Sequence, residues 1–181
     1  LEGESVFINN EFHNCKGLRK IHLEIARVGA GLQILHCVFF PEPSFDVPIF
    51  GVDIVAGPAG VSAAIVDLSP VGSSLPSLVI DKLKKISRPL FAHTRELPEW
   101  GSVFSPYVCF IRPSKSVEEG LFLALVNDYL ETLSLCLALT VPEALDSAST
   151  IERHQGQIFY CHQQKRNDKT RSVLAKAFNS K

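Results

Sequence analysis

The sequence has no methionine and no marked excess of charge of either sign. Its 181 residues include no methionine, and 18 lysines and arginines nearly balance 19 aspartates and glutamates, so the formal net charge is −1. Proteins that bind nucleic acid through its phosphates carry a clear excess of positive charge, so we predict no nucleic-acid partner. Because no initiator methionine is present, we expect an excised or processed domain.

No apolar stretch of the chain is both long and uninterrupted. The most apolar window, 121–141, contains Asn127, Asp128 and Glu131 near its middle. Three such groups in hydrocarbon would be very costly, so we predict that this window does not span a membrane.

The sequence also has no Cys-x-x-Cys pair and no glycine-rich phosphate loop between a strand and a helix. The first absence argues against a zinc site, and the second argues against nucleotide, NAD or FAD binding. Five scattered cysteines do not make a disulfide framework, and their odd number fits a reducing compartment such as the cytosol or the plastid stroma.

What is present predicts one packed globular domain, since apolar residues make up 46% of the chain and charged residues 20%. Apolar and polar residues alternate with period two over 19–28, and a second strand is predicted over 32–40. Residues 50–56 and 61–68 are two more strand-like runs, and their short connection forces them into an antiparallel hairpin. We therefore predict a meander of four or more strands.

The second half of the chain changes to helical patterns. The run 116–119, Ser-Val-Glu-Glu, predicts a capping box, and the helix that follows should end near residue 140 because Pro142 stops it. Before this helix, 107–112 predicts one more strand, and 151–178 has helical composition. Strands followed by helices predict an α+β fold with helices packed on an antiparallel sheet.

Four ionisable residues interrupt the apolar strands: His22, Glu24, His36 and Asp53. If consecutive strands pair antiparallel, one face can gather all four. Acids and imidazoles on an apolar face indicate a pocket that handles protons. Two alternatives stay open: the residues lie on the solvent face of a half-buried sheet, or His22, Glu24 and His36 hold a metal ion.

The C-terminal segment 151–181 is a basic pole, with seven basic and two acidic side chains. Its run 165–171 could bind an acidic protein or the carboxylates of a small ligand. The alternative is a solvated helix face, and charge alone does not decide between the two.

Seven runs, in order along nearly the whole chain, resemble the ferredoxin-dependent bilin reductases. They are residues 19–24, 34–38, 50–58, 61–65, 95–101, 110–114 and 167–171. Within that family, the combination of Glu24, His36 and Asp53 is most similar to the members that form phycocyanobilin. The resemblance implies a three-layer α/β/α sandwich with a central antiparallel sheet. It also implies a single domain over 1–181 that lacks the N-terminal and C-terminal segments of the family.

The same resemblance implies an enzyme that reduces biliverdin IXα to phycocyanobilin through bilin radicals. Electrons are expected one at a time from reduced ferredoxin, and no bound flavin, metal or nicotinamide and no partner subunit are expected. The alternatives are a family member with another bilin product, a tetrapyrrole carrier without turnover, and a relative of red chlorophyll catabolite reductase, which shares the fold.

The resemblance further implies roles for the four ionisable residues. Asp53 is expected to be the principal proton donor, with His36 as its partner across the sheet. Glu24 is expected to protonate the vinyl group of the D-ring, and His22 to support the others.

Two more groups of residues follow from the resemblance. Arg95 and Lys169 are expected to bind the two propionates of the substrate, with Ser62 as a weaker hydrogen-bond donor. Asn167 and Asp168 are expected to lie near the bilin on the C-terminal helix. Arg95 has the alternative role of an ion pair with Glu96 or Glu99. The expected docking surface for an acidic ferredoxin consists of Lys165, Arg166, Arg171 and Lys176.

Overall fold

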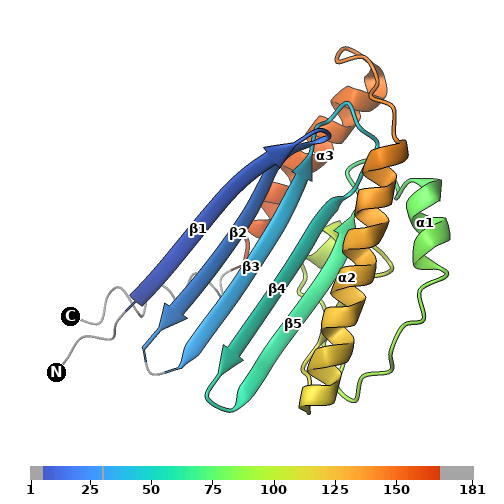
Figure 1. Cartoon of the computed structure of the whole chain (residues 1–181). Coiled ribbons are helices and arrows are strands. Elements are labelled where there is room, and N and C mark those ends of the chain that lie inside the picture. The colour runs from blue at the N-terminus through green and yellow to red at the C-terminus, as the bar shows by residue number, and fades with distance from the viewer. Residues whose placement is uncertain (1–5, 30, 168–181) are drawn as a thin grey trace.

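The computed structural model describes residues 6–29 and 31–167. Its centre is a six-stranded antiparallel sheet in which the strands lie side by side in chain order (Figure 1). The strands are β1 (Val6–Cys15), β2 (Leu18–Val28), β3 (Leu32–Pro41), β4 (Ile49–Gly57), β5 (Gly60–Ser69) and β6 (Cys109–Ile111).

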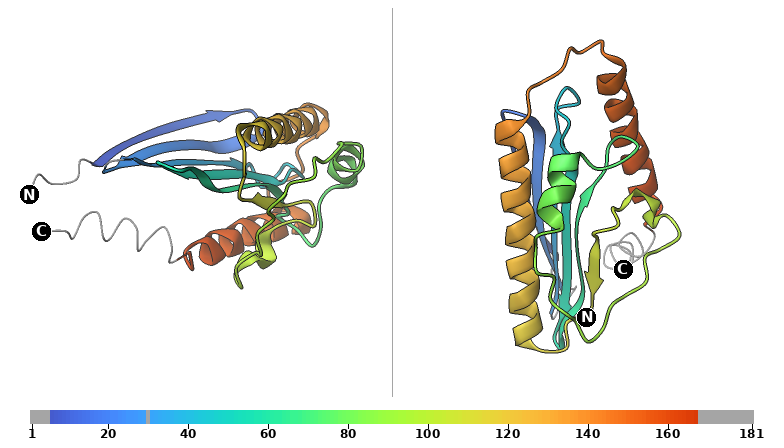
Figure 2. Two further views of the ribbon diagram at one scale, coloured as in Figure 1. Left: turned by 90° about the horizontal axis from the view of Figure 1, so that it is seen from below. Right: turned by 90° about the vertical axis from the view of Figure 1, so that its right-hand side faces the viewer.

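Helices cover both faces of this sheet (Figure 2). The long helix α2 (Ser116–Leu139) lies along one face, with the short helix α1 (Ser77–Leu83) packed against it. On the other face lie α3 (Ala148–Gln164) and the 3-10 helix η1 (Gly101–Val103). The predicted α+β fold and its three-layer α/β/α arrangement are therefore confirmed, and the helices come mainly from the C-terminal half.

Alternation along the strands builds an apolar core on each face. The larger core joins the sheet to α2 through Phe50, Val66, Phe122 and Leu133, each at most 2% exposed. The smaller core lies under α3 and includes Tyr160. By length and composition alone α2 could cross a membrane, but one side of it packs into the larger core, as the core helix of a sandwich does.

The sequence predictions missed β1 and α1. The four predicted strands are β2 to β5, and 107–112 contributes the shorter β6. Nine of the ten residues of β1 are exposed, so this edge strand has no apolar face to produce a period-two pattern. Helix α3 ends at Gln164, before the end of the predicted helix 151–178, and residues 168–181 lie outside the described part of the chain.

The predicted capping box is wrong. Helix α2 begins at Ser116, but its N-cap is Lys115 and no side chain caps it. The acid expected to complete the box, Glu119, therefore has no capping role, and the preceding acid, Glu118, accepts hydrogen bonds from the amide of Ser114 at 2.6 Å and from its hydroxyl at 2.8 Å. The glutamate therefore fixes the loop before the helix instead of the first helical turn.

Candidate active site

Antiparallel pairing places the predicted ionisable residues in one row across the sheet. Glu24 of β2 pairs with His36 of β3, which in turn pairs with Asp53 of β4. His22 lies on the same face, in the next row. The structure thus brings the four residues together, and their roles in proton transfer stay predictions. From β1 to β6 the row reads Asn10, Glu24, His36, Asp53, Ile65 and Phe110.

His36 and Asp53 form the closest pair in the row. Nδ1 of His36 donates to Oδ1 of Asp53 at 2.5 Å, and the two side chains are 35% and 42% exposed. Burial lowers the pKa of His36, but the hydrogen bond and charge of Asp53, with the charge of Glu24, outweigh burial and raise it above its ordinary value. The pair can therefore hold a proton on a face that a bound molecule can reach.

His22 has different surroundings. Its Nε2 donates to Oδ1 of Asn10 at 2.7 Å, and the ring of Phe12 stacks on it with 4.5 Å between centroids. The ring of His36 meets it edge-on at 5.5 Å. Burial and the charges of His36 and Lys20 lower the pKa of His22 below its ordinary value. Two neighbouring imidazoles therefore favour different charge states, as expected of a proton donor beside a neutral partner.

Tyr160 of α3 reaches the site from the opposite layer. A Cβ atom on Gly51 would come within 3.3 Å of its hydroxyl oxygen, and Gln164 donates to this oxygen at 3.1 Å. Burial raises the pKa of Tyr160, and the charge of Asp53 raises it further, so the phenol keeps its proton. No sequence pattern singles out this residue, apart from its position in a helix that leads to the predicted Asn167.

Arg95 lies at the β6 end of the ionisable row. Its Nη1 donates to the backbone oxygen of Ser62 at 2.9 Å, and its guanidinium lies over the ring of Phe110, 5.2 Å from the centroid. Over the described residues, Arg95 forms no ion pair with Glu96 or Glu99, so that alternative is wrong. Its charge is therefore not neutralised by a neighbouring carboxylate.

The remaining predicted binding and docking residues are described only in part. The hydroxyl of Ser62 donates to the backbone oxygen of Val55 at 3.1 Å, so its proton is already engaged. Lys165 and Arg166 are exposed at the C-terminal end of α3, and Asn167 follows them. The others lie outside the described residues: Asp168, Lys169, Arg171 and Lys176.

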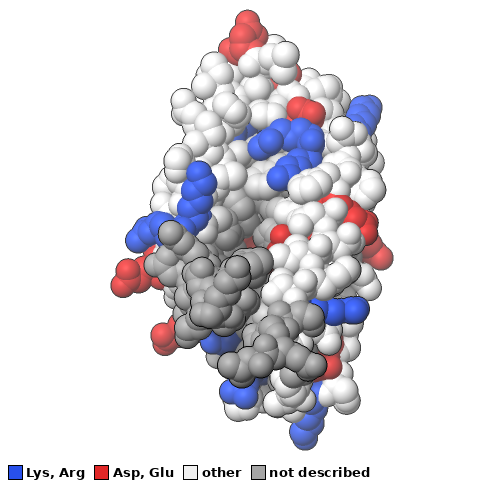
Figure 3. Space-filling model, turned by 90° about the vertical axis from the view of Figure 1, so that its left-hand side faces the viewer, with Lys and Arg blue, Asp and Glu red and all other residues white. Residues whose placement is uncertain are grey.

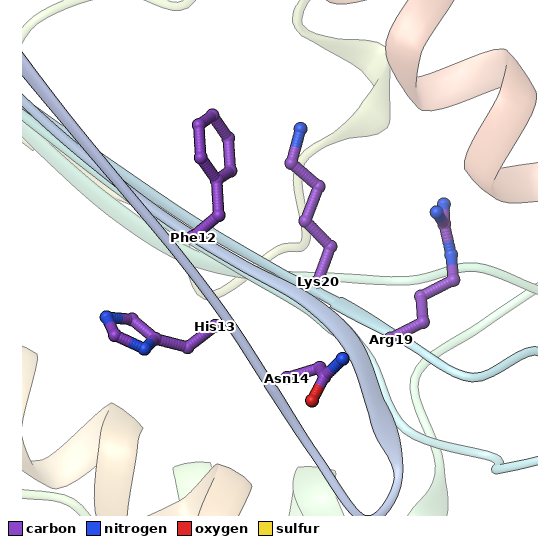
Figure 4. Close-up of a pocket in the computed structure, with 5 residues that line it drawn as sticks. All are labelled: Phe12, His13, Asn14, Arg19 and Lys20. Atoms are coloured by element: carbon purple, nitrogen blue, oxygen red, sulfur yellow. The ribbon is translucent and has the colours of Figure 1, made fainter.

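The β1–β2 hairpin forms one boundary of this face. A cavity of about 590 Å³ there is lined by Phe12, His13, Asn14, Arg19 and Lys20 (Figure 4). Phe12, Arg19 and Lys20 point to the side of α3, and the other two point to the opposite side. Nζ of Lys20 lies 5.1 Å from the centroid of the Phe12 ring, and Arg19 donates to Gln157 of α3 at 2.8 Å. Viewed from the side of β1, the surface is hollowed, and both basic and acidic side chains lie near the hollow (Figure 3).

The metal alternative gains no support from the arrangement of the side chains. Over residues 6–29 and 31–167, no three histidine, cysteine, aspartate or glutamate side chains are placed to hold a metal ion. Glu24, His36 and Asp53 instead form a linear row along the sheet, in which one carboxylate is hydrogen-bonded to the imidazole.

Comparison with known proteins gives one consistent result. The model of the family described as ferredoxin-dependent bilin reductase matches residues 1–181. A relative from Prochlorococcus marinus (strain MIT 9313), named phycocyanobilin:ferredoxin oxidoreductase, is 61% identical over 179 residues, which cover 99% of this chain and 68% of the relative. A relative of the same name from Synechococcus sp. (strain CC9902) is 61% identical over 179 residues, covering 99% of this chain and 73% of the relative.

A solved structure shares the fold. The crystal structure of phytochromobilin synthase from tomato in complex with biliverdin superposes with a TM-score of 0.71, covering 96% of this chain and 67% of that one. The two sequences are 19% identical, so the likeness concerns the arrangement of the elements.

Proposed function

Because the chain belongs to the ferredoxin-dependent bilin reductases, we propose that it reduces biliverdin IXα to phycocyanobilin with electrons from ferredoxin. The relatives that are 61% identical to it are named phycocyanobilin:ferredoxin oxidoreductase. The observation that carries the proposal is the His36–Asp53 pair at 2.5 Å. A protein that receives only electrons from its donor must itself deliver protons to chosen atoms of the substrate, and this pair is built to hold one.

The reaction adds hydrogen first across the vinyl group of the D-ring and then across a double bond of the A-ring. Each electron from ferredoxin is matched by one proton from the protein, so that no charge accumulates on the tetrapyrrole. We assign the protonation of the tetrapyrrole system to Asp53, which recovers its proton from His36 through their hydrogen bond. We assign the protonation of the vinyl group to Glu24, which pairs with His36 on the adjoining strand.

The electron donor needs its own surface on the enzyme. We place it at the basic residues that end α3, Lys165 and Arg166, together with Arg171 and Lys176. Both described members of this set are exposed and charged, which suits an acidic ferredoxin. We further propose that the enzyme is a monomer. We place it in the cytoplasm because the relatives named above are cyanobacterial.

An anaerobic turnover assay with biliverdin, reduced ferredoxin and product chromatography tests the proposed function. The wild-type chain is expected to shift the bilin absorption on binding and to yield phycocyanobilin. Asp53→Asn is expected to bind biliverdin but to stall after electron entry, with a bilin radical visible by electron paramagnetic resonance. A spectral shift without any consumption of reduced ferredoxin by the wild type would show a carrier, and full conversion by Asp53→Asn at the wild-type rate would remove the role of this acid.

A further inference from the structure

A second cavity, of about 950 Å³, is lined by both Arg95 and Ser62, the residues already assigned to substrate binding. It lies where β5 and β6 meet the chain segment 93–95. No aspartate or glutamate lines it, while two arginines, a histidine and three hydroxyl side chains do: Ser62, His93, Thr94, Arg95, Arg112 and Ser114.

Backbone pairing fixes the two arginines on neighbouring segments. The amide of Arg95 donates to the carbonyl of Phe110 at 2.8 Å, and the amide of Arg112 donates to the carbonyl of His93 at 2.9 Å. Within the described part of the chain, neither arginine forms an ion pair with a carboxylate. Two arginines that have no ion-paired carboxylate among the described residues therefore line one cavity.

The carboxylate of Glu118 borders this cavity through Ser114, but it is already engaged. It accepts hydrogen bonds from the amide of Ala92 at 2.8 Å, from the amide of Ser114 at 2.6 Å and from the Ser114 hydroxyl at 2.8 Å. These donors, with the charge of His93, lower the pKa of Glu118 to about 2. This acid therefore serves the loop before α2 and does not neutralise the arginines.

We propose that Arg112 is a further carboxylate-binding residue of the bilin site, which pairs with a propionate of the substrate beside Arg95. The inference rests on the proposed function, because biliverdin carries two propionates. A guanidinium can bind a carboxylate through two parallel hydrogen bonds, and two of them in an acid-free cavity match a diacid in number and charge. Arg95 stacks on Phe110, which lies two strands from Asp53 in the same row, so the cavity lies at the β6 end of the ionisable row.

The arrangement makes Arg112 a specificity-determining residue. A diacid tetrapyrrole gains two charge-assisted contacts in this cavity, whereas its dimethyl ester presents no carboxylate and gains neither. The binding of biliverdin and of biliverdin dimethyl ester, followed by the absorption of the bilin, therefore measures the contribution of each arginine apart from turnover.

The test compares the dissociation constants of both bilins for the wild-type chain, Arg112→Gln, Arg95→Gln and the double variant. Arg112→Gln is expected to weaken biliverdin binding by about tenfold or more, the usual loss of one charged hydrogen-bond partner. Binding of the dimethyl ester should change by much less. The matched control is Lys115→Gln, which removes one positive charge at an exposed position near Arg112 and outside the cavity lining, and should leave both constants unchanged.

The measured dissociation constants test the role of Arg112 separately from the proposed function. Biliverdin binding by Arg112→Gln at wild-type affinity, or an equal loss for acid and ester, overturns the role of Arg112 while leaving the proposed function intact. A wild-type chain that does not bind biliverdin overturns both. Circular dichroism confirms that the variants are folded, and Arg112→Lys adds a check, since a single ammonium should restore only part of the affinity for the diacid.

Discussion

At the scale of single residues, the site depends on two imidazoles with opposite pKa shifts. The carboxylates of Asp53 and Glu24 raise the pKa of His36 against the effect of burial, and burial with the charge of His36 lowers that of His22. At a pH near the ordinary value of about 6.5, His36 is therefore mainly protonated and His22 mainly neutral. One face of the sheet thus carries a stored proton and, beside it, an unprotonated ring.

The first prediction concerns this difference in protonation. Asp53→Asn should lower the pKa of His36, because the variant removes a charged hydrogen-bond partner. The pKa of His22 should rise in the same variant, since a neutral His36 no longer repels its proton. Nuclear magnetic resonance titration of both rings, without bilin, measures the two shifts. An unchanged titration of His36 would mean that the pair does not form in solution.

A second prediction belongs to Glu24. Glu24→Gln keeps the shape of the side chain but cannot supply a proton, so the A-ring should be reduced while the vinyl group of the D-ring stays intact. Product chromatography would then show a bilin other than phycocyanobilin. The control is Glu11→Gln on β1, an exposed glutamate on the face opposite to the ionisable row, which should leave the product unchanged. Unaltered phycocyanobilin from Glu24→Gln would refute the role.

At the scale of elements, α3 packs very closely against the segment that follows β5. A Cβ atom on Gly156 would lie 1.8 Å from the carbonyl oxygen of Val71, so the helix and the segment after β5 approach through a glycine. Buried polar side chains add to this contact, because Arg153 donates to the carbonyl of Pro43 at 2.7 Å and Gln157 donates to that of Pro41 at 3.0 Å. The distance between α3 and the sheet is therefore fixed by backbone contacts.

A third prediction compares two glycines in helices. Gly156→Ala should destabilise the fold by about 1–3 kcal/mol, because backbone must move to admit the methyl group. Gly120→Ala in α2 should stabilise it by about 1 kcal/mol, since nothing lies within 4 Å of the added Cβ and alanine favours a helix. Denaturant unfolding gives both values. Equal effects of the two substitutions would contradict the close approach of α3.

The elements that could be predicted are those in which one face is buried. In β2 the alternation of Ile21, Leu23 and Ile25 with polar residues placed His22 and Glu24 on one face. In β3 the buried Ile34, Val38 and Phe40 have the same parity as His36. The edge strand β1 has almost no buried residue, so nothing in its sequence indicated that it would bring a partner to His22.

The parts of the site that come from other layers could not be predicted in the same way. Tyr160 is far from Asp53 in the chain, and only the packing of α3 over Gly51 brings the two near each other. The capping motif at 116–119 was also misread, because α2 begins at Ser116 with Lys115 as its N-cap, so neither Ser116 nor Glu119 caps the helix.

At the scale of the whole molecule, charge is unevenly distributed, and the proposed docking surface for the electron donor lies at the basic end. Lys165 and Arg166 lie exposed where α3 ends, in a segment that is basic while the rest of the chain is acidic in balance. Attraction between such a pole and an acidic ferredoxin increases the rate of encounter and is screened by salt.

A fourth prediction follows from this screening. Turnover at limiting ferredoxin should fall as ionic strength rises, while biliverdin affinity changes less. Reversing Lys165 and Arg166 to glutamate should raise the ferredoxin concentration needed for half-maximal rate and leave the bilin spectrum alone. The control reverses Lys84 and Lys85, an exposed pair at the end of α1. Normal turnover by the first double variant at low ferredoxin and low salt would place the docking surface elsewhere.

The chain order of the strands has a consequence for how the protein acquires its site. Every residue of the ionisable row from Asn10 to Ile65 comes from strands that are neighbours both in the sheet and in the sequence. Such local pairings close short loops, so the row can assemble hairpin by hairpin as the chain leaves the ribosome. Helix α3, which brings Tyr160, is synthesised after all of them. The ionisable row can therefore be aligned on an open sheet before the tyrosine that faces it is synthesised.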